Sequence, residues 1–297
     1  MNIELVGQFR QKLILQIKKF PTYFYIGLLL VIISWTLNWS LSGLRTQWAF
    51  FPLWLGYSLT IDGLVFYRKG TSIISRNLHG FILLFIFSIP VWWLFELLNQ
   101  FTHNWYYAGR QYFTNFEYNI YASLNFSTVM PSVLSTAELA STFSWIKNIR
   151  KSFKVEPTNN NLQLFFAAGI LMLFLLLIMP NIFYVFIWLS VFFIIEPLNY
   201  KLQNVNLFDY TRVGNWKPVI SLSIGGLICG FFWEMWNYLS YPKWVYSVPG
   251  VNFLHIFEMP LLGYLGYIPF ALELFSLYHL IALMTKNKKL RSLIQID

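Results

Sequence analysis

The sequence predicts an all-α polytopic membrane protein, a bundle of about eight transmembrane helices. Of the 297 residues, 57% are hydrophobic, 21% are aromatic and only 11% are charged, and the mean hydropathy is +0.53. This profile is typical of chains that lie in a bilayer. The apolar runs are long and continuous, as in FAAGILMLFLLLIMP at 166–180, which indicates helices and not the short alternating strands of a barrel.

The first 20 residues alternate apolar and basic side chains and predict an amphipathic helix that lies on the cytoplasmic leaflet. Pro21 then opens the first span. A cleavable signal peptide is the alternative, because Lys18 and Lys19 precede an apolar core. No small-residue cleavage site follows that core, so we expect an uncleaved helix.

Eight spans can be placed along the chain. They lie near residues 23–41, 48–67, 78–100, 116–140, 162–179, 181–200, 217–240 and 257–284. The fourth is the most polar, since its centre is rich in Ser, Thr and Asn and contains Pro131. We expect neighbouring helices to shield it from lipid. In the last span, a Pro- and Gly-rich segment at 259–270 should loosen the helix, which favours a cavity wall there; the alternative is that these residues only allow close helix packing.

The only long polar linker divides the chain in half. The expected parts are an amphipathic helix (1–20), a first four-helix repeat (21–146), the linker (147–161), a second four-helix repeat (162–285) and a basic tail (286–297). With a cytoplasmic N-terminus, all but three of the 21 lysines and arginines fall in cytoplasmic segments, the exceptions being Arg45, Arg110 and Lys243. This bias predicts that both termini are cytoplasmic, in a plasma or inner membrane.

A motif appears once in each half. FELLNQFTHNWYY begins at Phe95 and WEMWNYLSYPKWVY at Trp233, and a Phe-Glu pair follows each. Six residues match at offsets of 138 to 141, namely Glu96, Asn99, Trp105, Tyr107, Phe116 and Glu117 with Glu234, Asn237, Trp244, Tyr246, Phe257 and Glu258. The near-constant offset indicates an internal repeat. With four spans per copy, the halves run in parallel and the two motifs should face each other across a pseudo-twofold axis.

Eight acidic residues lie within or at the ends of predicted spans, with no basic partner inside a helix. They are Asp62, Glu96, Glu117, Glu138, Glu196, Glu234, Glu258 and Glu273. Charge is costly at membrane depth, so such groups face protein or a cavity and often mark a site. A single one of them can equally be a capping or snorkelling residue.

The acids fall into two layers. Glu96 and Asn99, like Glu234 and Asn237, share a helix face near the outer end of their span. Glu117 and Glu258 are expected to begin the next helices at that surface, where the helix dipole favours negative charge. The inner layer is expected to contain Glu138, Glu273, Asp62 and Glu196.

The composition limits which partners and cofactors the chain can be expected to bind. The single cysteine, Cys229, excludes an intrachain disulfide and a cysteine-based metal site. The histidines do not repeat with the motif, so no metal site is predicted and the cofactor is left unassigned. The net charge of +9 lies in blocks that encode topology, which points to a lipid bilayer and not to nucleic acid.

Three functions remain open. The first is a membrane enzyme that acts on a lipid-soluble, isoprenoid or carotenoid-type substrate, in which a neutral carboxylic acid protonates an alkene and aromatic faces stabilise the carbocation. The second is a proton- or cation-coupled transporter, and the third is a non-catalytic assembly or binding protein. A discrete cavity open to lipid favours the first, a polar path between the acid layers the second, and individually capped acids the third.

The candidate residues follow from the motif. The catalytic candidates are Glu234, Glu258, Glu96 and Glu117, with Asn237 and Asn99 as orienting groups. The candidate substrate contacts are Trp233, Trp236, Trp244, Tyr246, Trp105, Tyr107, Glu273 and Glu138.

Overall fold

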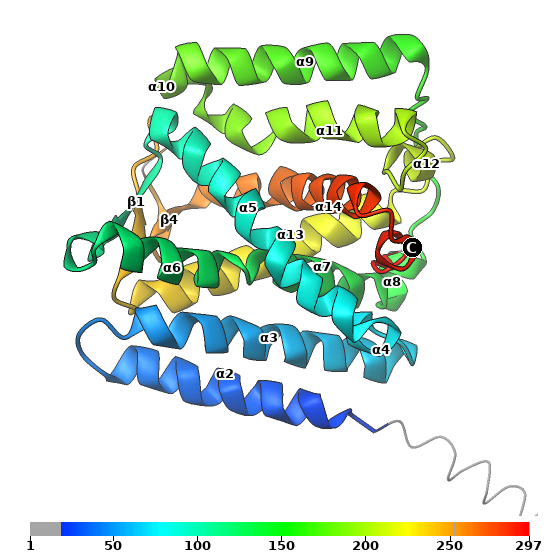
Figure 1. Ribbon diagram of the computed structural model, residues 1–297. Coiled ribbons are helices and arrows are strands. Elements are labelled where there is room, and N and C mark those ends of the chain that lie inside the picture. Colours follow the sequence, from blue (N-terminus) through cyan, green and yellow to red (C-terminus); the bar gives the residue numbers. More distant parts are fainter. Residues whose placement is uncertain (1–18, 252, 297) are drawn as a thin grey trace, which may run out of the picture.

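The protein is a helical bundle, and seven segments of its described part are long and apolar enough to cross a membrane. The computed structural model describes residues 19–251 and 253–296 (Figure 1), so the amphipathic helix predicted for 1–20 lies almost wholly outside the described residues. The seven segments are α2 (Thr22–Ser40), α3 (Thr46–Lys69), α5 (Leu78–Thr102), α9 (Asn159–Ile178), α10 to α11 (Pro180–Lys201), α13 (Lys217–Tyr238) and η3 to α14 (Leu261–Met284). This is the architecture of an integral, multi-pass membrane protein.

The predicted fourth span, 116–140, forms two helices and not one. They are α6 (Asn115–Phe126) and α7 (Val129–Ser141), and they are separated by Ser127 and Thr128. Both hydroxyls turn back onto backbone carbonyls, that of Ser127 onto Leu124 (2.6 Å) and that of Thr128 onto Asn125 (2.7 Å), which competes with a regular helix. All of α7 except Leu139 is buried, as expected for a polar segment shielded by neighbours.

Short elements connect the long helices. The helical ones are α4 (Ile73–Arg76), η1 (Arg110–Tyr112), α8 (Ser144–Lys147), α12 (Phe208–Thr211) and α15 (Lys288–Arg291). Two of the membrane-length segments are themselves composite: Pro180–Lys201 consists of α10 (Pro180–Phe183), η2 (Tyr184–Trp188) and α11 (Ser190–Lys201), and Leu261–Met284 consists of η3 (Leu261–Gly266) and α14 (Tyr267–Met284). The strands are β1 (Trp105–Ala108), β2 (Lys243–Tyr246), β3 (His255–Ile256) and β4 (Met259–Pro260). The eighth predicted span therefore begins with a hairpin and a 3₁₀ turn, because Pro260 and the following glycines interrupt a regular helix.

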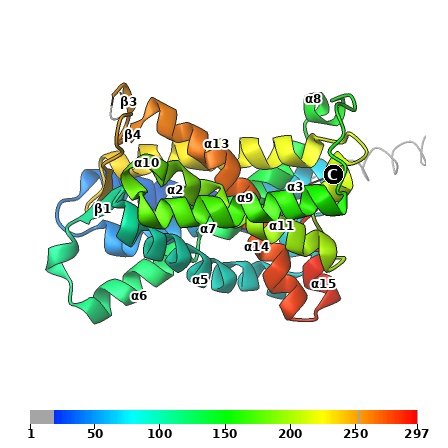
Figure 2. The same cartoon turned by 90° about the horizontal axis from the view of Figure 1, so that it is seen from above.

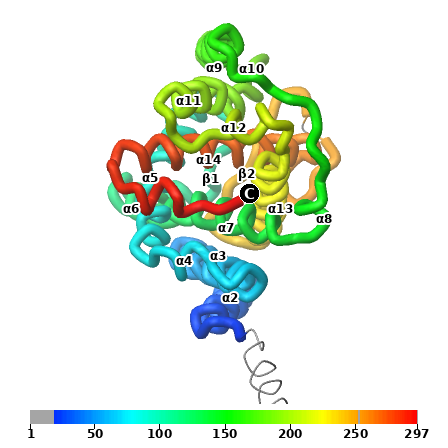
Figure 3. The backbone as a smooth tube through the Cα atoms, turned by 90° about the vertical axis from the view of Figure 1, so that its right-hand side faces the viewer, coloured from blue at the N-terminus to red at the C-terminus, as the bar shows by residue number. Residues whose placement is uncertain are grey.

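The helices stack from α2 at one edge to α9 at the other (Figure 3). At the α2 edge, Gly27 and Gly56 let two backbones touch, since a Cβ on either glycine would lie 2.7 Å from the carbonyl oxygen of the other. Helices α3, α7, α13 and α14 form the centre. The outer helices α2 and α9 expose apolar side chains such as Leu29 and Phe174, which implies contact with bilayer lipid.

The two ends of the bundle differ in charge. In Figure 1, α4, α8, α12 and the C-terminus lie at one end, and β1, β4 and α10 lie at the other. Figure 2 shows the same separation from above. Within the described residues, the lysine and arginine blocks at 68–76, 147–154, 201–217 and 286–291 belong to the first end, so these segments, which were predicted to share one side of the membrane, are together in the fold. We refer to the two ends as the basic end and the β end.

Candidate functional site

The two motif copies meet at the β end as a two-stranded antiparallel ribbon. Strand β1 pairs with β2 in the register Trp105↔Tyr246, Tyr106↔Val245 and Tyr107↔Trp244. Because Trp105 corresponds to Trp244 in the motif and Tyr107 to Tyr246, each copy makes the same contact to the other. The ribbon therefore has a local pseudo-twofold axis at its central pair.

The motif asparagines anchor these strands to the helix ends. The Asn99 amide accepts a hydrogen bond from the N–H of Asn104 (2.9 Å) and donates one to the Trp105 carbonyl (2.8 Å). The Asn237 amide accepts from the Trp244 N–H (3.0 Å) and donates to its carbonyl (2.7 Å). The role shown for both asparagines is thus to hold the backbone, and neither has a hydrogen bond to its neighbouring glutamate in the described chain.

In the first copy, one carboxylate oxygen carries all the hydrogen bonds. The Oε1 atom of Glu96 accepts from the indole N–H of Trp92 (3.0 Å), the indole N–H of Trp105 (3.0 Å) and the hydroxyl of Tyr107 (2.5 Å). Three donors converging on one oxygen hold this carboxylate in a single position.

In the second copy, the corresponding carboxyl has fewer partners. The Oε1 atom of Glu234 accepts from the hydroxyls of Tyr246 (2.8 Å) and Tyr267 (2.5 Å). Its Oε2 atom is buried and has no hydrogen-bond partner among the described residues. The indole N–H of Trp244, the counterpart of Trp105, lies close to the Glu234 carboxyl and the Tyr246 hydroxyl but forms no hydrogen bond of normal length and angle within the described residues.

A glycine accounts for the difference between the copies. Trp92 lies four residues before Glu96, and Gly230 lies four residues before Glu234. A Cβ at Gly230 would overlap the ring of Tyr267, so the missing side chain admits this tyrosine from α14. Tyr267 thereby takes the donor position that Trp92 holds in the first copy.

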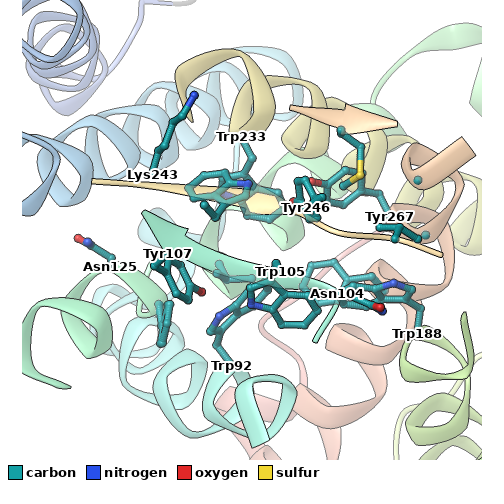
Figure 4. A pocket seen from close by; sticks show the side chains of 18 of the residues that line it. Trp92, Asn104, Trp105, Tyr107, Asn125, Trp188, Trp233, Lys243, Tyr246 and Tyr267 are labelled. Carbon is teal, nitrogen blue, oxygen red and sulfur yellow. The ribbon is translucent and has the colours of Figure 1, made fainter. Parts of the chain in front are cut away.

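A cavity of about 460 Å³ lies around the ribbon (Figure 4). Its volume is in the range of pockets that bind small organic ligands. Its wall is largely apolar and rich in aromatic side chains, and the lining includes Trp92, Trp105, Tyr107, Tyr118, Tyr121, Phe126, Trp188, Trp233, Trp244, Tyr246, Tyr267 and Phe270. Apolar, aromatic walls of this kind suit a ligand that is itself largely apolar.

Part of the cavity wall consists of residues that the motif singles out. Of the predicted substrate contacts, Trp233, Trp244, Tyr246, Trp105 and Tyr107 line the cavity. The other three are not among the lining residues, since Trp236 packs against Trp54 and Phe232 and the acids Glu138 and Glu273 lie in α7 and α14.

Other lining residues were missed by sequence reasoning. Tyr267 lies in the Pro- and Gly-rich segment that was expected to line a cavity, and that segment was the available signal for it. Trp188 comes from η2 and stacks on Trp105 with ring centroids 5.9 Å apart. Nothing in the local sequence of Trp188 indicates this contact.

Two motif glutamates have local partners of their own. Glu117 is exposed and lies at the start of α6 as expected, where its carboxylate accepts hydrogen bonds from the Thr114 N–H (2.9 Å) and hydroxyl (2.8 Å). These bonds lower its pKa. The expectation that Glu258 begins a helix and has no basic partner is wrong. It lies in the turn between β3 and β4, after a Phe257 with φ of 59°, and forms an ion pair with Lys243.

Glu138, the most buried acidic residue of the first half, is also paired with cations. Glu138 in α7 forms a bidentate ion pair with Arg76 (2.7 and 2.6 Å) and lies 3.6 Å from Lys69. The expectation that it lacks a basic partner is wrong, because both cations come from the segment around α4 and fold back over the end of α7.

The remaining buried acids also hold parts of the fold together. Their partners are Tyr23 and the Ile74 N–H for Asp62, Ser276 and the Leu207 N–H for Glu196, and the Phe192 N–H for Glu273. Of these three acids, Glu273 alone has a carboxyl oxygen that lacks a partner among the described residues.

Within residues 19–251 and 253–296, no three His, Cys, Asp or Glu side chains come together in a group that could hold a metal ion. Compared with protein-family models, curated proteins and solved structures, the chain has no significant match.

Proposed function

We propose that this integral membrane protein is an enzyme that binds a lipid-soluble molecule of isoprenoid type in the aromatic cavity and transfers a proton to it. The observation that carries the proposal is the arrangement around Glu234. Two cavity-lining hydroxyls, those of Tyr246 and Tyr267, donate to one of its oxygens, and the other oxygen is buried without a partner in the described chain. The protonated acid would carry its hydrogen on that second oxygen.

The walls and rim of the cavity support an apolar substrate that arrives from the bilayer. Val185, Leu262 and Leu265 line the cavity and are exposed on the surface of the bundle. All three lie in segments apolar enough to span a membrane. A molecule dissolved in lipid could therefore enter between η2 and η3 without crossing water.

The proposed reaction is protonation of a carbon–carbon double bond. The proton forms a new C–H bond, the π bond supplies its electrons, and a carbocation remains on the neighbouring carbon. Aromatic faces such as those of Trp105, Trp188 and Trp233 stabilise this cation. Loss of a proton from an adjacent carbon returns the acid, so the outcome is a redox-neutral isomerisation or cyclisation.

We propose that tyrosine relays the proton. Tyr267 lines the cavity, whereas Glu234 is not among the lining residues. Burial and the neighbouring Glu234 raise the pKa of Tyr246 well above its usual value, so that hydroxyl remains a donor and stabilises the carboxylate that forms. A half-turn of the Glu234 carboxyl group would bring its protonated oxygen to Tyr267, and the Tyr267 hydroxyl would then give its own proton to the substrate while it takes this one from Glu234, in a single concerted step without a free tyrosinate.

A transporter has weaker support. Proton or cation transport calls for carboxylates that exchange their partners along a path between the two ends. The acids toward the basic end are instead held by Arg76, by hydroxyls and by backbone N–H groups. Their positions favour structural roles for Asp62, Glu138 and Glu196.

The test compares two matched substitutions, Glu234→Gln and Glu96→Gln, in cells that otherwise lack the protein. General acid catalysis contributes roughly 10²- to 10⁴-fold, so Glu234→Gln should abolish the change in lipid and pigment profile that the wild-type protein causes. Glu96→Gln should retain turnover, because we propose that Glu96 only positions the ribbon. Tyr267→Phe should lose most of the activity while the protein stays folded.

Two outcomes would overturn the proposed reaction. The first is an unchanged lipid and pigment profile in folded Glu234→Gln. The second is that the lipid and pigment profile is the same with and without the protein, while the protein causes a proton flux that Glu234→Gln abolishes. This result would favour the transporter.

We further propose that the two motifs arose by duplication and that the basic end faces the cytoplasm. The near-constant offset and the matching roles of Asn99 and Asn237 support the first proposal. The gathering of the basic segments at one end supports the second.

A further inference from the structure

We propose that the ligand of the aromatic cavity is an elongated alcohol, with an apolar body and a hydroxyl group toward each end that pairs with Asn104 at one end and Asn125 at the other. This inference rests on the proposed function, because it takes the cavity to be the binding site. It adds the chemical class of the ligand and the two residues that recognise its polar groups.

Most polar groups in the cavity wall are already engaged. The hydroxyls of Tyr107 and Tyr246 donate to the motif glutamates. The Arg110 guanidinium donates to the Phe113 carbonyl (2.7 Å), and the Lys243 ammonium is paired with Glu258. These side chains hold the wall together and are poorly placed to recognise a ligand as well.

Two cavity-lining amides differ from that pattern. The side-chain oxygens of Asn104 and Asn125 are buried, and neither has a hydrogen-bond partner in the described part of the chain. Asn104 is only 4% exposed. Its backbone is tightly held, since its N–H donates to Asn99 and its carbonyl accepts from Ser247 (2.8 Å). Buried polar atoms are nearly always hydrogen-bonded, so each of these two oxygens calls for a donor that the described residues do not supply.

The two amides lie apart along the cavity. Figure 4 shows Asn125 beyond Tyr107 at one end of the row of aromatic side chains and Asn104 near Trp188 at the other. The rings of Trp92 and Trp105 lie between them. A ligand that reaches both amides therefore has its apolar part against the indole faces and its polar groups toward the ends.

A hydroxyl is the group that fits such an amide best. An amide offers both a donor and an acceptor, and its two ends are interchangeable by a flip of the side chain. A hydroxyl can donate and accept, so it pairs with either orientation. An ether can only accept, and a hydrocarbon leaves the amide unpaired.

The test measures binding of three probes to the purified full-length protein in detergent by native mass spectrometry. The probes are the C20 isoprenoid alcohol geranylgeraniol, the C20 hydrocarbon that lacks its hydroxyl, and the diol that carries a second hydroxyl at the far end of the chain. Each hydroxyl should improve the Kd by roughly three- to tenfold, which gives the order diol, alcohol, hydrocarbon. Asn104→Leu and Asn125→Leu, which keep the side-chain shape, should each remove the gain from one hydroxyl. Neither should change the Kd of the hydrocarbon, which cannot form a hydrogen bond and also serves as the folding control.

The outcomes separate the two proposals. If all three probes bind the wild-type protein equally, or if neither asparagine variant alters the order, the alcohol inference is wrong and the cavity remains an apolar binding site. If none of the probes binds, the cavity as the ligand site is wrong, and the proposed function fails together with the inference.

Discussion

Removal of one partner from the ion pair between Arg76 and Glu138 should be among the most destabilising single substitutions in the bundle. Glu138 is fully buried, and Arg76 meets both of its oxygens at 2.7 and 2.6 Å. The same guanidinium donates twice to the Leu293 carbonyl, at 3.0 and 2.7 Å. Arg76 therefore ties α4, α7 and the C-terminal segment together, and Arg76→Met removes all of these bonds while keeping an apolar stem.

The expected cost follows from the charge that is left behind. Breaking a buried pair by removal of one partner costs about 3 to 5 kcal/mol, because the other charge remains uncompensated. Lys69 stays 3.6 Å from Glu138 and offsets part of this, so we expect a loss of about 3 kcal/mol. At 1.4 kcal/mol per tenfold, this lowers the folding equilibrium constant by roughly a hundredfold.

Unfolding in mixed detergent micelles, followed by tryptophan fluorescence, can measure this loss. Removing both charges in Arg76→Met with Glu138→Met should recover most of the stability, since no buried charge then lacks a partner. Lys69→Met serves as the control and should cost less than about 1 kcal/mol, because its side chain is 26% exposed and more distant. A loss below about 1 kcal/mol in Arg76→Met, or a double variant no more stable than the single one, would refute the reasoning.

Two further predictions concern the cap of α6 and the orientation in the membrane. Hydrogen bonds from Thr114 lower the pKa of Glu117 below 4.5, the pKa of a glutamate that lacks them. The carboxylate therefore caps α6 fully above pH 4.5, and the cap is lost as the pH falls through the lowered pKa. The protection factors of amides in the first turn of α6, which compare exchange with its intrinsic rate at each pH, should therefore fall in acid, and Glu117→Gln should abolish this fall; an identical fall in the variant would contradict the assignment. For orientation, Gln111→Cys at the β end should react with an impermeant maleimide in intact cells, and Lys288→Cys at the basic end only after permeabilisation, in a background where the buried Cys229 is replaced by Ser. The reverse labelling pattern would place the basic end outside.

Membrane class and approximate spans were predictable from local sequence, and the structure confirms an α-helical, multi-pass protein with buried carboxylates. Hydropathy sums over about twenty residues, and so the seven apolar segments stand out without any knowledge of their neighbours. The break between α6 and α7 at Ser127 was not predicted, because it depends on which carbonyls accept hydrogen bonds from the Ser127 and Thr128 hydroxyls.

The candidate site was predictable only where the motif itself forms it. The motif singled out Glu96 with Tyr107 and Glu234 with Tyr246 as candidate site residues, and each pair is hydrogen-bonded in the structure, although the spacing alone did not predict these bonds. Contacts within one helix and its following strand are short in sequence, so the pattern of residue types can report them.

What only the tertiary structure decided are the contacts between distant segments. The sequence by itself determined the protein's class, its spans, its basic blocks and the recurring Glu-Asn-Trp-Tyr pattern. It did not determine that Arg76 neutralises Glu138, that the bare backbone at Gly230 admits Tyr267, or that η2 closes the aromatic wall. The physical reason is that hydropathy and spacing describe each segment alone, whereas the partner of a buried polar group is chosen by how helices far apart in the chain pack against one another.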